Sequence, residues 1–296
     1  MSDQSSKNGS SNGFERIRVE RPAEGVARVV LARPEAANAQ DRKMLYEIND
    51  ALDAAARDDT VKVIIAADGV HFSSGHDLRD RSSMSEFNTV LPYGEFDAPG
   101  QEGAMAREQE IYLGFCWRWR NLPKPTIAAV QGKVIAGGLM LVWPFDLVVA
   151  ADNAQFSDPV VAFGVNGVEY FVHPFEVGAR KAKQMLFTGE AISAAEAHRL
   201  GMVNEVVPAA DLSTYTLDLA RRIAEQPLMG LKLAKQSVNQ AMDNMGLWNT
   251  IQAAFGLHHL GHSHNAQRFG MMADPSGAER IKAQARAASP APGGGA

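Results

Sequence analysis

Hydrophobic residues recur along the chain with two different periods, and the change between them predicts strands followed by helices. Residues 61–67 (VKVIIAA) form a continuous apolar run of strand length, as expected of a parallel strand that is covered on both faces. In residues 40–57 the apolar side chains instead recur every three or four positions, which predicts an amphipathic helix. Further strands are predicted at residues 17–20, 27–31, 126–130, 145–150 and 155–157.

The second half of the chain is predicted to be mostly helical. Residues 106–121 already show a helical pattern, residues 139–143 are predicted to begin a helix, and after residue 174 only residues 203–207 read as a strand. The later helices are predicted at residues 176–186, 193–200, 211–225, 227–244 and 247–268. Alternating strands and helices followed by helices alone indicate an α/β fold with a helical C-terminal part.

Three segments show neither period. Residues 79–105 contain scattered glycines and prolines, and a loop of this length is usually functional or mobile. Residues 1–13 are polar and residues 287–296 are rich in proline, glycine and alanine, so both are predicted to be disordered tails. The first has no apolar stretch of the kind that a secretory signal needs.

Composition narrows the class of protein. The 296 residues are 46% hydrophobic and 21% charged, which suits a chain with a sizeable core. The formal net charge of −5 provides no basic field for nucleic acid or for an anionic membrane. The single cysteine, Cys116, lies among aromatic residues, so we expect a buried thiol and a reducing, cytoplasmic location.

Two glycine-containing segments carry the candidate chemistry. Residues 71–78 (HFSSGHDL) and 130–140 (VQGKVIAGGLM) each place a predicted strand before a turn and a helical stretch. Such turns leave backbone N–H groups unpaired, and Gly137 and Gly138 let a ligand approach the main chain closely. Two N–H groups that converge on one point form an oxyanion hole. The alternatives are glycines that only begin a helix and a phosphate-binding loop, although the P-loop pattern is absent.

A series of motifs from about residue 16 to residue 212 resembles the crotonase (enoyl-CoA hydratase/isomerase) superfamily in order and spacing. The motifs are RPEAANA at 33–39, FSSGHDL at 72–78, KPTIAAVQG at 124–132 with AGG at 136–138, DL at 146–147 with AQF at 154–156, and FTGE at 187–190 with SAAEA at 193–197. Their joint occurrence is far more specific than any one of them.

This resemblance implies an α/β fold, with a crotonase-like ββα spiral at residues 14–208 and a C-terminal helical trimerisation region at residues 209–286. It implies a homotrimer or a dimer of trimers, an acyl-CoA thioester as substrate, and no separate cofactor. The thioester oxygen would be held by the backbone N–H groups of His76 and Gly137. Positive charge for CoA would come from Arg33, Arg79 and Arg81. The other residues that the resemblance places along the substrate are Ala37, Ser74, Gly75, Asp77, Leu78, Ala136, Met140, Pro159 and Val160.

Met140 and Val160 depart from the pattern of the hydratases. Hydratases of this family use a glutamate at each of these two positions, one to place a water and one to deliver a proton. Neither a methionine nor a valine side chain can transfer a proton or orient water. The sequence therefore predicts thioester enolate chemistry with a different acid or base.

Glu169 is the preferred candidate for that acid or base. Apolar neighbours surround it in the sequence and would raise its pKa toward neutrality. The alternative is a carboxylate that is exposed or paired with an arginine. Asp158, His173 and Tyr170 are weaker candidates, since a turn cap, a packed loop histidine and a core residue explain them equally well.

Two other activities stay open at this point. The His76 side chain belongs to an SxGHD pattern that resembles methylmalonyl-CoA decarboxylase-like members of the superfamily, which implies decarboxylation through an enolate. A side chain turned toward solvent is the alternative for His76. The second possibility is a homologue that binds acyl-CoA without catalysis.

Histidines cluster near the end of the last predicted long helix. His258 and His262 lie four residues apart on one helix face, a spacing that can bind zinc. No glutamate lies between them and no third ligand is evident from the sequence. We therefore expect no metal site, and a polar subunit contact or a solvated face instead.

Overall fold

Two β-sheets organise the chain. The computed structural model describes residues 13–66 and 69–288. In these residues the larger sheet has the strand order β1-β2-β3-β4-β6-β9 and the smaller sheet the order β5-β7-β8. Only β1–β2 is antiparallel in the larger sheet. The strands are β1 Ile17–Ala23, β2 Val26–Leu31, β3 Val63–Ala66, β4 Thr126–Val130, β5 Lys133–Ile135, β6 Leu147–Ala151, β7 Gln155–Ser157, β8 Ile192–Ser193 and β9 Glu205–Val207.

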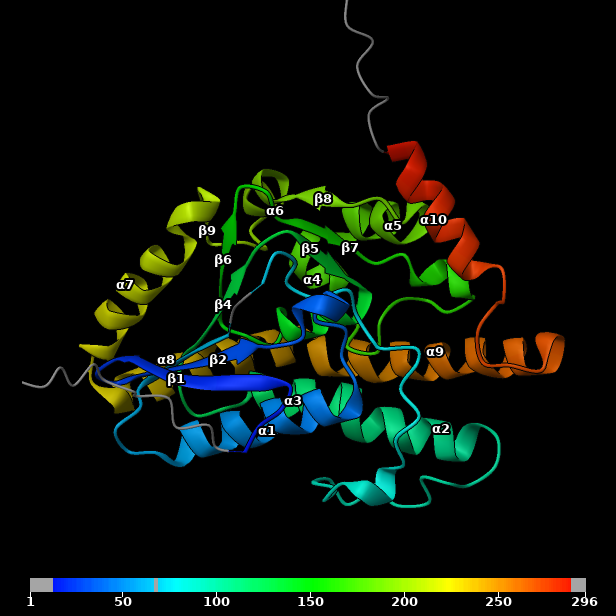
Figure 1. Cartoon of the computed structure of the whole chain (residues 1–296), viewed down its shortest axis with the longest axis horizontal. Coiled ribbons are helices and arrows are strands. Elements are labelled where there is room, and N and C mark those ends of the chain that lie inside the picture. The colour runs from blue at the N-terminus through cyan, green and yellow to red at the C-terminus, as the bar shows by residue number, and fades with distance from the viewer. Residues whose placement is uncertain (1–12, 67–68, 289–296) are drawn as a thin grey trace, which may run out of the picture.

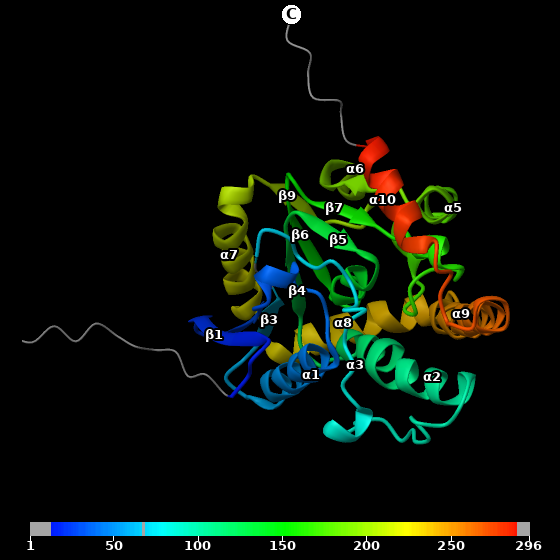
Figure 2. The ribbon, with the colours of Figure 1, turned by 45° about the vertical axis from the view of Figure 1, so that its right-hand side comes forward.

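Helices surround the sheets, and the longest of them follow the last strand (Figure 1). Figures 1 and 2 both place α2 next to α9, and the two helices are in contact. The α-helices are α1 Arg42–Arg57, α2 Gln101–Glu108, α3 Phe115–Arg120, α4 His173–Val177, α5 Ala179–Thr188, α6 Ala194–Leu200, α7 Leu212–Ala224, α8 Leu228–Asn244, α9 Leu247–Phe269 and α10 Gly277–Ala288. A π-helical segment, Gln109–Gly114, joins α2 to α3.

The central strands of the larger sheet are covered on both faces. In β4, Ile127 and Ala129 pack in a cluster with Leu212 and Ala220 of α7. The alternate residues of the same strand, Ala128 and Val130, belong to the main core, which also contains the buried side chains of α1 and α3. Side chains alternate between the faces of a strand, so burial on both faces requires the continuous apolar runs seen in the sequence. The predicted α/β fold with a helical C-terminal part is confirmed.

Three local predictions differ from the structure. The stretch predicted to begin a helix at residues 139–143 is a 3-10 helix that spans Ala136–Leu141, and no helix directly follows residues 71–78. The helix predicted at residues 176–186 is two helices, because Gly178 (φ 76°) separates α4 from α5. Helix α10 was not predicted, and it extends to Ala288, into the segment expected to be a tail. Residues 1–12 and 289–296 of the predicted tails lie outside the described residues.

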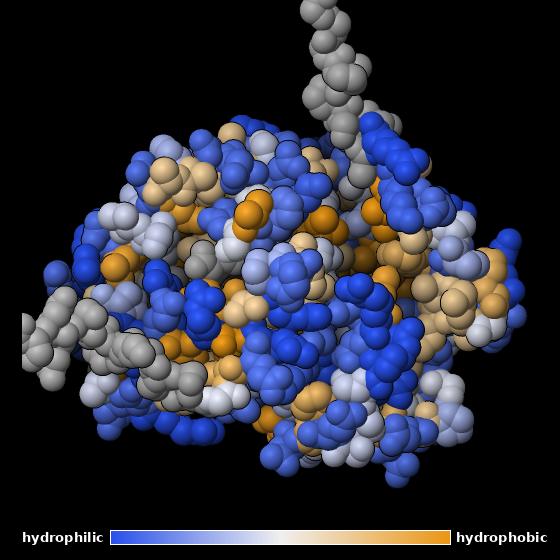
Figure 3. Space-filling view, viewed as in Figure 1, coloured by the Kyte–Doolittle hydropathy of each residue, from blue (hydrophilic) through white to orange (hydrophobic). Residues whose placement is uncertain are grey.

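The surface agrees with a chain whose apolar residues are mostly in the core. On the face in Figure 3, hydrophilic residues predominate and apolar residues form small groups between them. Within residues 13–66 and 69–288, no helix combines the length and the apolar character that crossing a membrane would require.

Candidate active site

Two turns that are far apart in the sequence lie side by side at the end of the smaller sheet. The segment around Ser73 runs beside β5, since Ser73 N–H donates to the carbonyl of Lys133 (3.2 Å) and Ile135 N–H donates to the carbonyl of Ser73 (3.0 Å). The buried Gln40 amide then donates to both Ser73 Oγ (3.0 Å) and the carbonyl of Gly137 (2.9 Å). These hydrogen bonds fix the turn at Gly75 against the turn at Gly137.

The approach of the two turns depends on glycine. Gly75 has φ of 92°, and a Cβ atom added there would lie 2.8 Å from the Ile135 carbonyl oxygen and 3.2 Å from the Gly137 nitrogen. A Cβ atom added at Gly137 would overlap the His76 ring. Ala136 adopts a left-handed φ of 48° between them, a strained conformation for a residue with a Cβ. Strain of this kind is often found at functional sites.

Some backbone groups of these turns form hydrogen bonds within the protein and others do not. Gln40 N–H donates to the Gly75 carbonyl (2.8 Å), and Asp77 N–H donates to the Gln40 carbonyl (2.9 Å). Among the turn and loop hydrogen bonds of the described residues, none uses the N–H of His76 or of Gly137. These are the two groups that the family resemblance assigned to the thioester oxygen.

The His76 side chain points into the protein and toward Glu169. Its ring packs edge-on against Tyr112, with 3.8 Å between ring centroids. Its Nε2 atom lies 3.8 Å from Glu169 Oε2, and this nitrogen is buried without a hydrogen-bond partner. The interpretation of His76 as turned toward solvent is therefore wrong, and the structure brings His76, Gly137 and Glu169 together.

Glu169 is held in place by its neighbours in the loop that follows η5 (Val160–Phe163). The Asp158 carboxylate accepts the N–H groups of Val160 (3.3 Å) and Val168 (3.0 Å). From the other side, His258 Nδ1 of α9 is 2.8 Å from the Gly167 carbonyl. These contacts fix Gly167 and Val168, which directly precede Glu169, and the Glu169 residue itself is 7% exposed.

Burial governs the proton affinity of Glu169. Desolvation raises its pKa to about 7, and the nearby His76 only partly opposes this effect. The predicted rise toward neutrality is confirmed, and the alternative of an exposed or arginine-paired carboxylate is wrong. The Glu169 carboxylate lies 3.8 Å from His76 Nε2 and 3.9 Å from His258 Nε2, which is beyond hydrogen-bonding distance, so neither histidine ring forms a hydrogen bond with it.

The surroundings of the weaker acid/base candidates give each of them a structural role. Asp158 and His173 are fully buried and pair with each other at 2.8 Å, so Asp158 holds its turn and His173, the first residue of α4, is a packed structural histidine. Tyr170 is 1% exposed and belongs to the core. Cys116 is also 1% exposed, and burial raises the pKa of its thiol, as expected of a structural cysteine.

The residues that the resemblance placed along the substrate differ in exposure. Ser74 and Leu78 are exposed, whereas Met140 lies in the core, with its carbonyl accepting the Cys116 thiol at 3.3 Å. Leu78 is 72% exposed. Of the remaining residues of this set, the half-buried ones are Ala37, Asp77, Ala136 and Val160, and the buried ones are Gly75 and Pro159.

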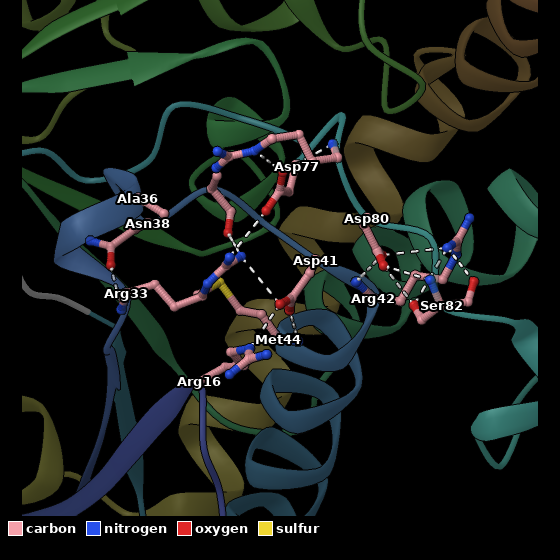
Figure 4. A network of polar contacts seen from close by, with 12 residues as sticks. Arg16, Arg33, Ala36, Asn38, Asp41, Arg42, Met44, Asp77, Asp80 and Ser82 are labelled. Carbon is pink, nitrogen blue, oxygen red and sulfur yellow. Dashed lines mark hydrogen bonds and ion pairs between the residues drawn. The ribbon is translucent and has the colours of Figure 1, made fainter.

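The three arginines proposed for CoA are not equivalent. Arg33 lies between Asp41 (3.2 Å) and Asp77 (3.0 Å) and is largely buried, so it holds the first motif to the second (Figure 4). Arg79 and Arg81 are exposed, and Arg79 contacts the Asp77 carboxylate at 3.4 Å. The positive charge that remains accessible therefore lies at Arg79 and Arg81, next to Leu78.

The structure adds a group of residues that the sequence did not assign. Glu108, at the end of α2, faces the α9 histidines, and its carboxylate lies 3.4 Å from His262 Nε2. His258 and His259 are 4% and 6% exposed, so the expectation of a solvated face is wrong for them. Sequence reasoning missed Glu108, and the one available signal was its spacing of four residues from Tyr112, which also faces the site.

Burial lowers the pKa values of these histidines, and the Glu108 carboxylate raises them. Desolvation lowers the pKa of His258, and it lowers that of His259 to about 4. Desolvation is the largest single effect on His262 and lowers its pKa, but the hydrogen bond and charge of Glu108, together with the Met272 carbonyl and Glu169, outweigh it, so the pKa is raised. The pKa of Glu108 is lowered, because the neighbouring imidazoles outweigh the effect of its own burial.

Comparison with known proteins places this geometry in a family. Residues 21–279 match the family model described as enoyl-CoA hydratase/isomerase. The putative enoyl-CoA hydratase EchA13 of Mycobacterium tuberculosis is 45% identical over 260 residues, which cover 85% of this chain and 82% of that protein. The 1,2-epoxyphenylacetyl-CoA isomerase of Escherichia coli is 33% identical over 226 residues, which cover 74% of this chain and 80% of that protein.

Solved structures agree in fold. The crystal structure of a probable enoyl-CoA hydratase from Mycobacterium smegmatis has a TM-score of 0.79 and 45% identity, and the match covers 87% of this chain and 98% of that one. An enoyl-CoA hydratase/isomerase from Xanthobacter autotrophicus Py2 has a TM-score of 0.75 and 30% identity, covering 94% and 100%. The crotonase-like fold is thereby confirmed, and the chain belongs to the enoyl-CoA hydratase/isomerase family of acyl-CoA enzymes.

Proposed function

We propose that this enzyme moves a double bond in an enoyl-CoA thioester by a single proton shuttle through Glu169. The observation that carries the proposal is the position of the Glu169 carboxylate, 3.8 Å from the side chain of His76 and next to the turn at Gly137. The N–H groups of His76 and Gly137 would hold the thioester oxygen. A base is then required beside the acyl carbons, and Glu169 is the carboxylate at that place.

The proposed reaction needs one acid/base group. Ionised Glu169 removes a proton from the α-carbon of a 3-enoyl-CoA, and the electron pair forms a dienolate whose oxygen accepts the N–H groups of His76 and Gly137. The protonated carboxyl then returns that proton to the γ-carbon, which gives the conjugated 2-enoyl-CoA and regenerates the carboxylate. The pKa of about 7 suits both halves of this cycle, since a group that gives and takes a proton works best near the ambient pH.

Hydration is the less favoured reaction for this site. Addition of water to a conjugated enoyl thioester requires one group to orient the water and another to deliver a proton. Met140 and Val160 stand where the resemblance to hydratases places those two groups, and neither can do this. The proposal therefore favours isomerisation over hydration within the family's chemistry.

Decarboxylation is disfavoured by the charge of the surroundings. A malonyl-type substrate would bring a carboxylate close to Glu169 and Glu108, and like charges in a poorly solvated site repel each other strongly. The proposed isomerisation uses an uncharged acyl chain and needs no cofactor beyond the CoA thioester itself. We further propose that Arg79 and Arg81 contact the CoA phosphates, and that the helical region at residues 209–286 forms a homotrimer.

The test is to measure isomerisation of a 3-enoyl-CoA and hydration of crotonyl-CoA with the wild-type enzyme, Glu169→Gln and Glu176→Gln. Burial also raises the pKa of Glu176, to about 8, but Glu176 lies on α4, away from His76, and so serves as the matched control. We expect isomerisation to exceed hydration in the wild type. Glu169→Gln should lower the isomerisation rate by about 10²–10⁴-fold, the usual contribution of general acid–base catalysis. Glu176→Gln should retain it.

Three outcomes would contradict the proposal. An unchanged rate in Glu169→Gln would remove Glu169 from the mechanism. Loss of CO₂ from a malonyl-type CoA ester would favour decarboxylation. Calorimetric binding of CoA esters without turnover of any of them would indicate a binding protein.

A further inference from the structure

Four polar side chains converge beside Glu169 without a role in the proposed reaction. Glu108 comes from the end of α2, and His258, His259 and His262 come from α9. The Glu108 carboxylate lies 3.7 Å from His258 Nε2, 3.2 Å from His259 Nε2 and 3.4 Å from His262 Nε2. The side chains of all four are between 5% and 13% exposed. We call these four residues the Glu108 cluster.

The outer nitrogen of each ring in the Glu108 cluster faces a carbonyl oxygen. His258 Nδ1 lies 2.8 Å from the Gly167 carbonyl, His262 Nδ1 lies 2.7 Å from the Met272 carbonyl, and His259 Nδ1 lies 3.3 Å from Gln101 Oε1. A carbonyl oxygen only accepts hydrogen bonds, so each Nδ1 carries the proton. In the neutral ring the lone pair is then on Nε2, which points at the centre of the cluster. Metal-binding histidines are oriented in this way by a carbonyl behind the ring.

Hydrogen bonding in the Glu108 cluster is incomplete. One carboxylate can pair with one imidazolium, which leaves two neutral rings whose Nε2 lone pairs face carboxylate oxygens that also carry only lone pairs. Glu108 Oε2 and His259 Nε2 are both buried without a hydrogen-bond partner among the described residues. Buried polar atoms of this kind are uncommon, and a bound ion is one of the few explanations.

The spacing of the donor atoms fits a metal ion. One donor atom from each of Glu108, His258 and His262 lies within 4.8 Å of the other two. Ligands about 2.1 Å from a tetrahedral ion are separated from each other by roughly 3.4 Å. The carboxylate-to-nitrogen distances of 3.2–3.7 Å match that separation without rearrangement of the helices.

We propose that the Glu108 cluster binds a divalent transition-metal ion of the zinc class, with Glu108, His258 and His262 as ligands and His259 as the neighbour that completes the site. Imidazole nitrogens favour zinc and related ions, whereas Mg²⁺ and Ca²⁺ prefer a shell made entirely of oxygen. The ion joins α2 to α9 at the point where His258 also holds the loop that carries Glu169. This site goes beyond the proposed function, since the proton shuttle through Glu169 requires no metal.

The experiment uses the full chain after treatment with a chelator and its removal. Binding of ZnCl₂ is measured by isothermal titration calorimetry and by the shift of the thermal unfolding temperature, for the wild type, His262→Ala, Glu108→Gln and His264→Ala. His264 lies two residues from His262 on the same helix and is exposed, so His264→Ala is the matched control. We expect one Zn²⁺ per chain, a higher unfolding temperature with Zn²⁺, and no comparable effect of MgCl₂.

His262→Ala and Glu108→Gln should each weaken Zn²⁺ binding at least tenfold, while His264→Ala should bind as the wild type does. Circular dichroism verifies that each variant is folded, and His262→Gln replaces His262→Ala if the smaller side chain prevents folding. The absence of Zn²⁺ binding in the wild type would overturn the proposal. Equal loss of binding in His264→Ala would also overturn it, because it would indicate a surface site. Neither result depends on turnover, so both leave the proposed isomerisation to its own test.

Discussion

Two carboxylate–histidine groups lie on or beside one loop but differ in how their carboxylates are used. Asp158 and His173 are completely buried, and the Asp158 carboxylate accepts hydrogen bonds from His173 Nε2 and from two backbone N–H groups, although His173 Nδ1 has no partner. Glu169 and the Glu108 cluster lie close by, yet their carboxylates and imidazole Nε2 atoms face one another without complete hydrogen bonding. A carboxylate that accepts three hydrogen bonds, as Asp158 does, stabilises its loop. Carboxylates and imidazoles left incomplete in one place indicate a site for something the protein binds.

Glu169 and Asp158 also differ in their partners. The Asp158 carboxylate accepts hydrogen bonds from Val160, Val168 and His173. The histidine nitrogens nearest to Glu169 lie beyond hydrogen-bonding distance, and burial raises the pKa of Glu169 to about 7. Asp158 therefore holds the loop, whereas Glu169 is the group that we propose for proton transfer.

The largest effect, on the free energy of unfolding, is expected from breaking the Asp158–His173 pair. Asp158→Ala removes the acceptor for His173 and for the N–H groups of Val160 and Val168, which leaves a buried histidine, one buried donor and one part-buried donor unpaired. Breaking a buried pair in this way typically costs about 3–5 kcal/mol in the free energy of unfolding. Urea unfolding measures it, with the exposed Asp218→Ala as the control, expected to change stability by less than about 0.5 kcal/mol. A small cost for Asp158→Ala would mean that the loop does not depend on this pair.

The next largest effect, on the reaction rate, is expected from adding a methyl group where the turns at Gly75 and Gly137 meet. A methyl group added in Gly137→Ala overlaps the His76 ring and must displace it, together with the backbone of the turn. If the N–H of Gly137 holds the thioester oxygen, the rate should decrease by about 10²–10³-fold, as for loss of one oxyanion donor. Gly256→Ala in α9 meets nothing within 4 Å and should keep its activity and gain slightly in stability. Full activity of Gly137→Ala would contradict the proposed role of this turn.

Much of this site could be predicted from the sequence, because its causes lie within single segments of the chain. The apolar runs of β4 and the glycines at 75 and 137 depend on near neighbours, so the strands of the larger sheet and the two turns were predicted, whereas the short strands β5 and β8 were not. The rise in the pKa of Glu169 could also be predicted, because the residues adjacent to it are apolar. In each case the chain segment itself contains the physical cause.

The Glu108 cluster could not be predicted, because its residues meet only through the packing of α2 against α9. The spacing of His258 and His262 indicated two ligands on one helix face, but nothing in the sequence specifies which helix that face meets. The same limit applies to His76, whose ring is turned inward by Tyr112 from another segment. Contacts between distant helices depend on the whole fold, and the sequence pattern of one element does not contain them.

The proton affinity of Glu169 predicts two pH profiles. Because the base must be ionised, kcat/KM of the wild type should rise about tenfold per pH unit below pH 7 and level off above it. Stability should change in the opposite direction. The folded state holds this proton up to a pH of about 7, whereas the unfolded carboxyl releases it near 4.5, so unfolding free energy should decrease as the pH rises between those values. Glu169→Gln should flatten both profiles, and an unchanged stability profile would contradict the assignment of this pKa.

The smallest effect concerns the exposed charge beside Leu78. Arg79 has an 83% exposed side chain, so its contact with Asp77 adds little to stability, and its main contribution would be attraction of the CoA phosphates. Arg79→Ala should therefore raise KM for an acyl-CoA by less than about fivefold, or roughly 1 kcal/mol, with kcat unchanged. The difference should shrink in high salt, which screens exposed charges. Arg57 of α1, 79% exposed and also paired with an aspartate, is the matched control. An equal rise in KM for Arg57→Ala would mean that net charge matters and that Arg79 contacts no phosphate.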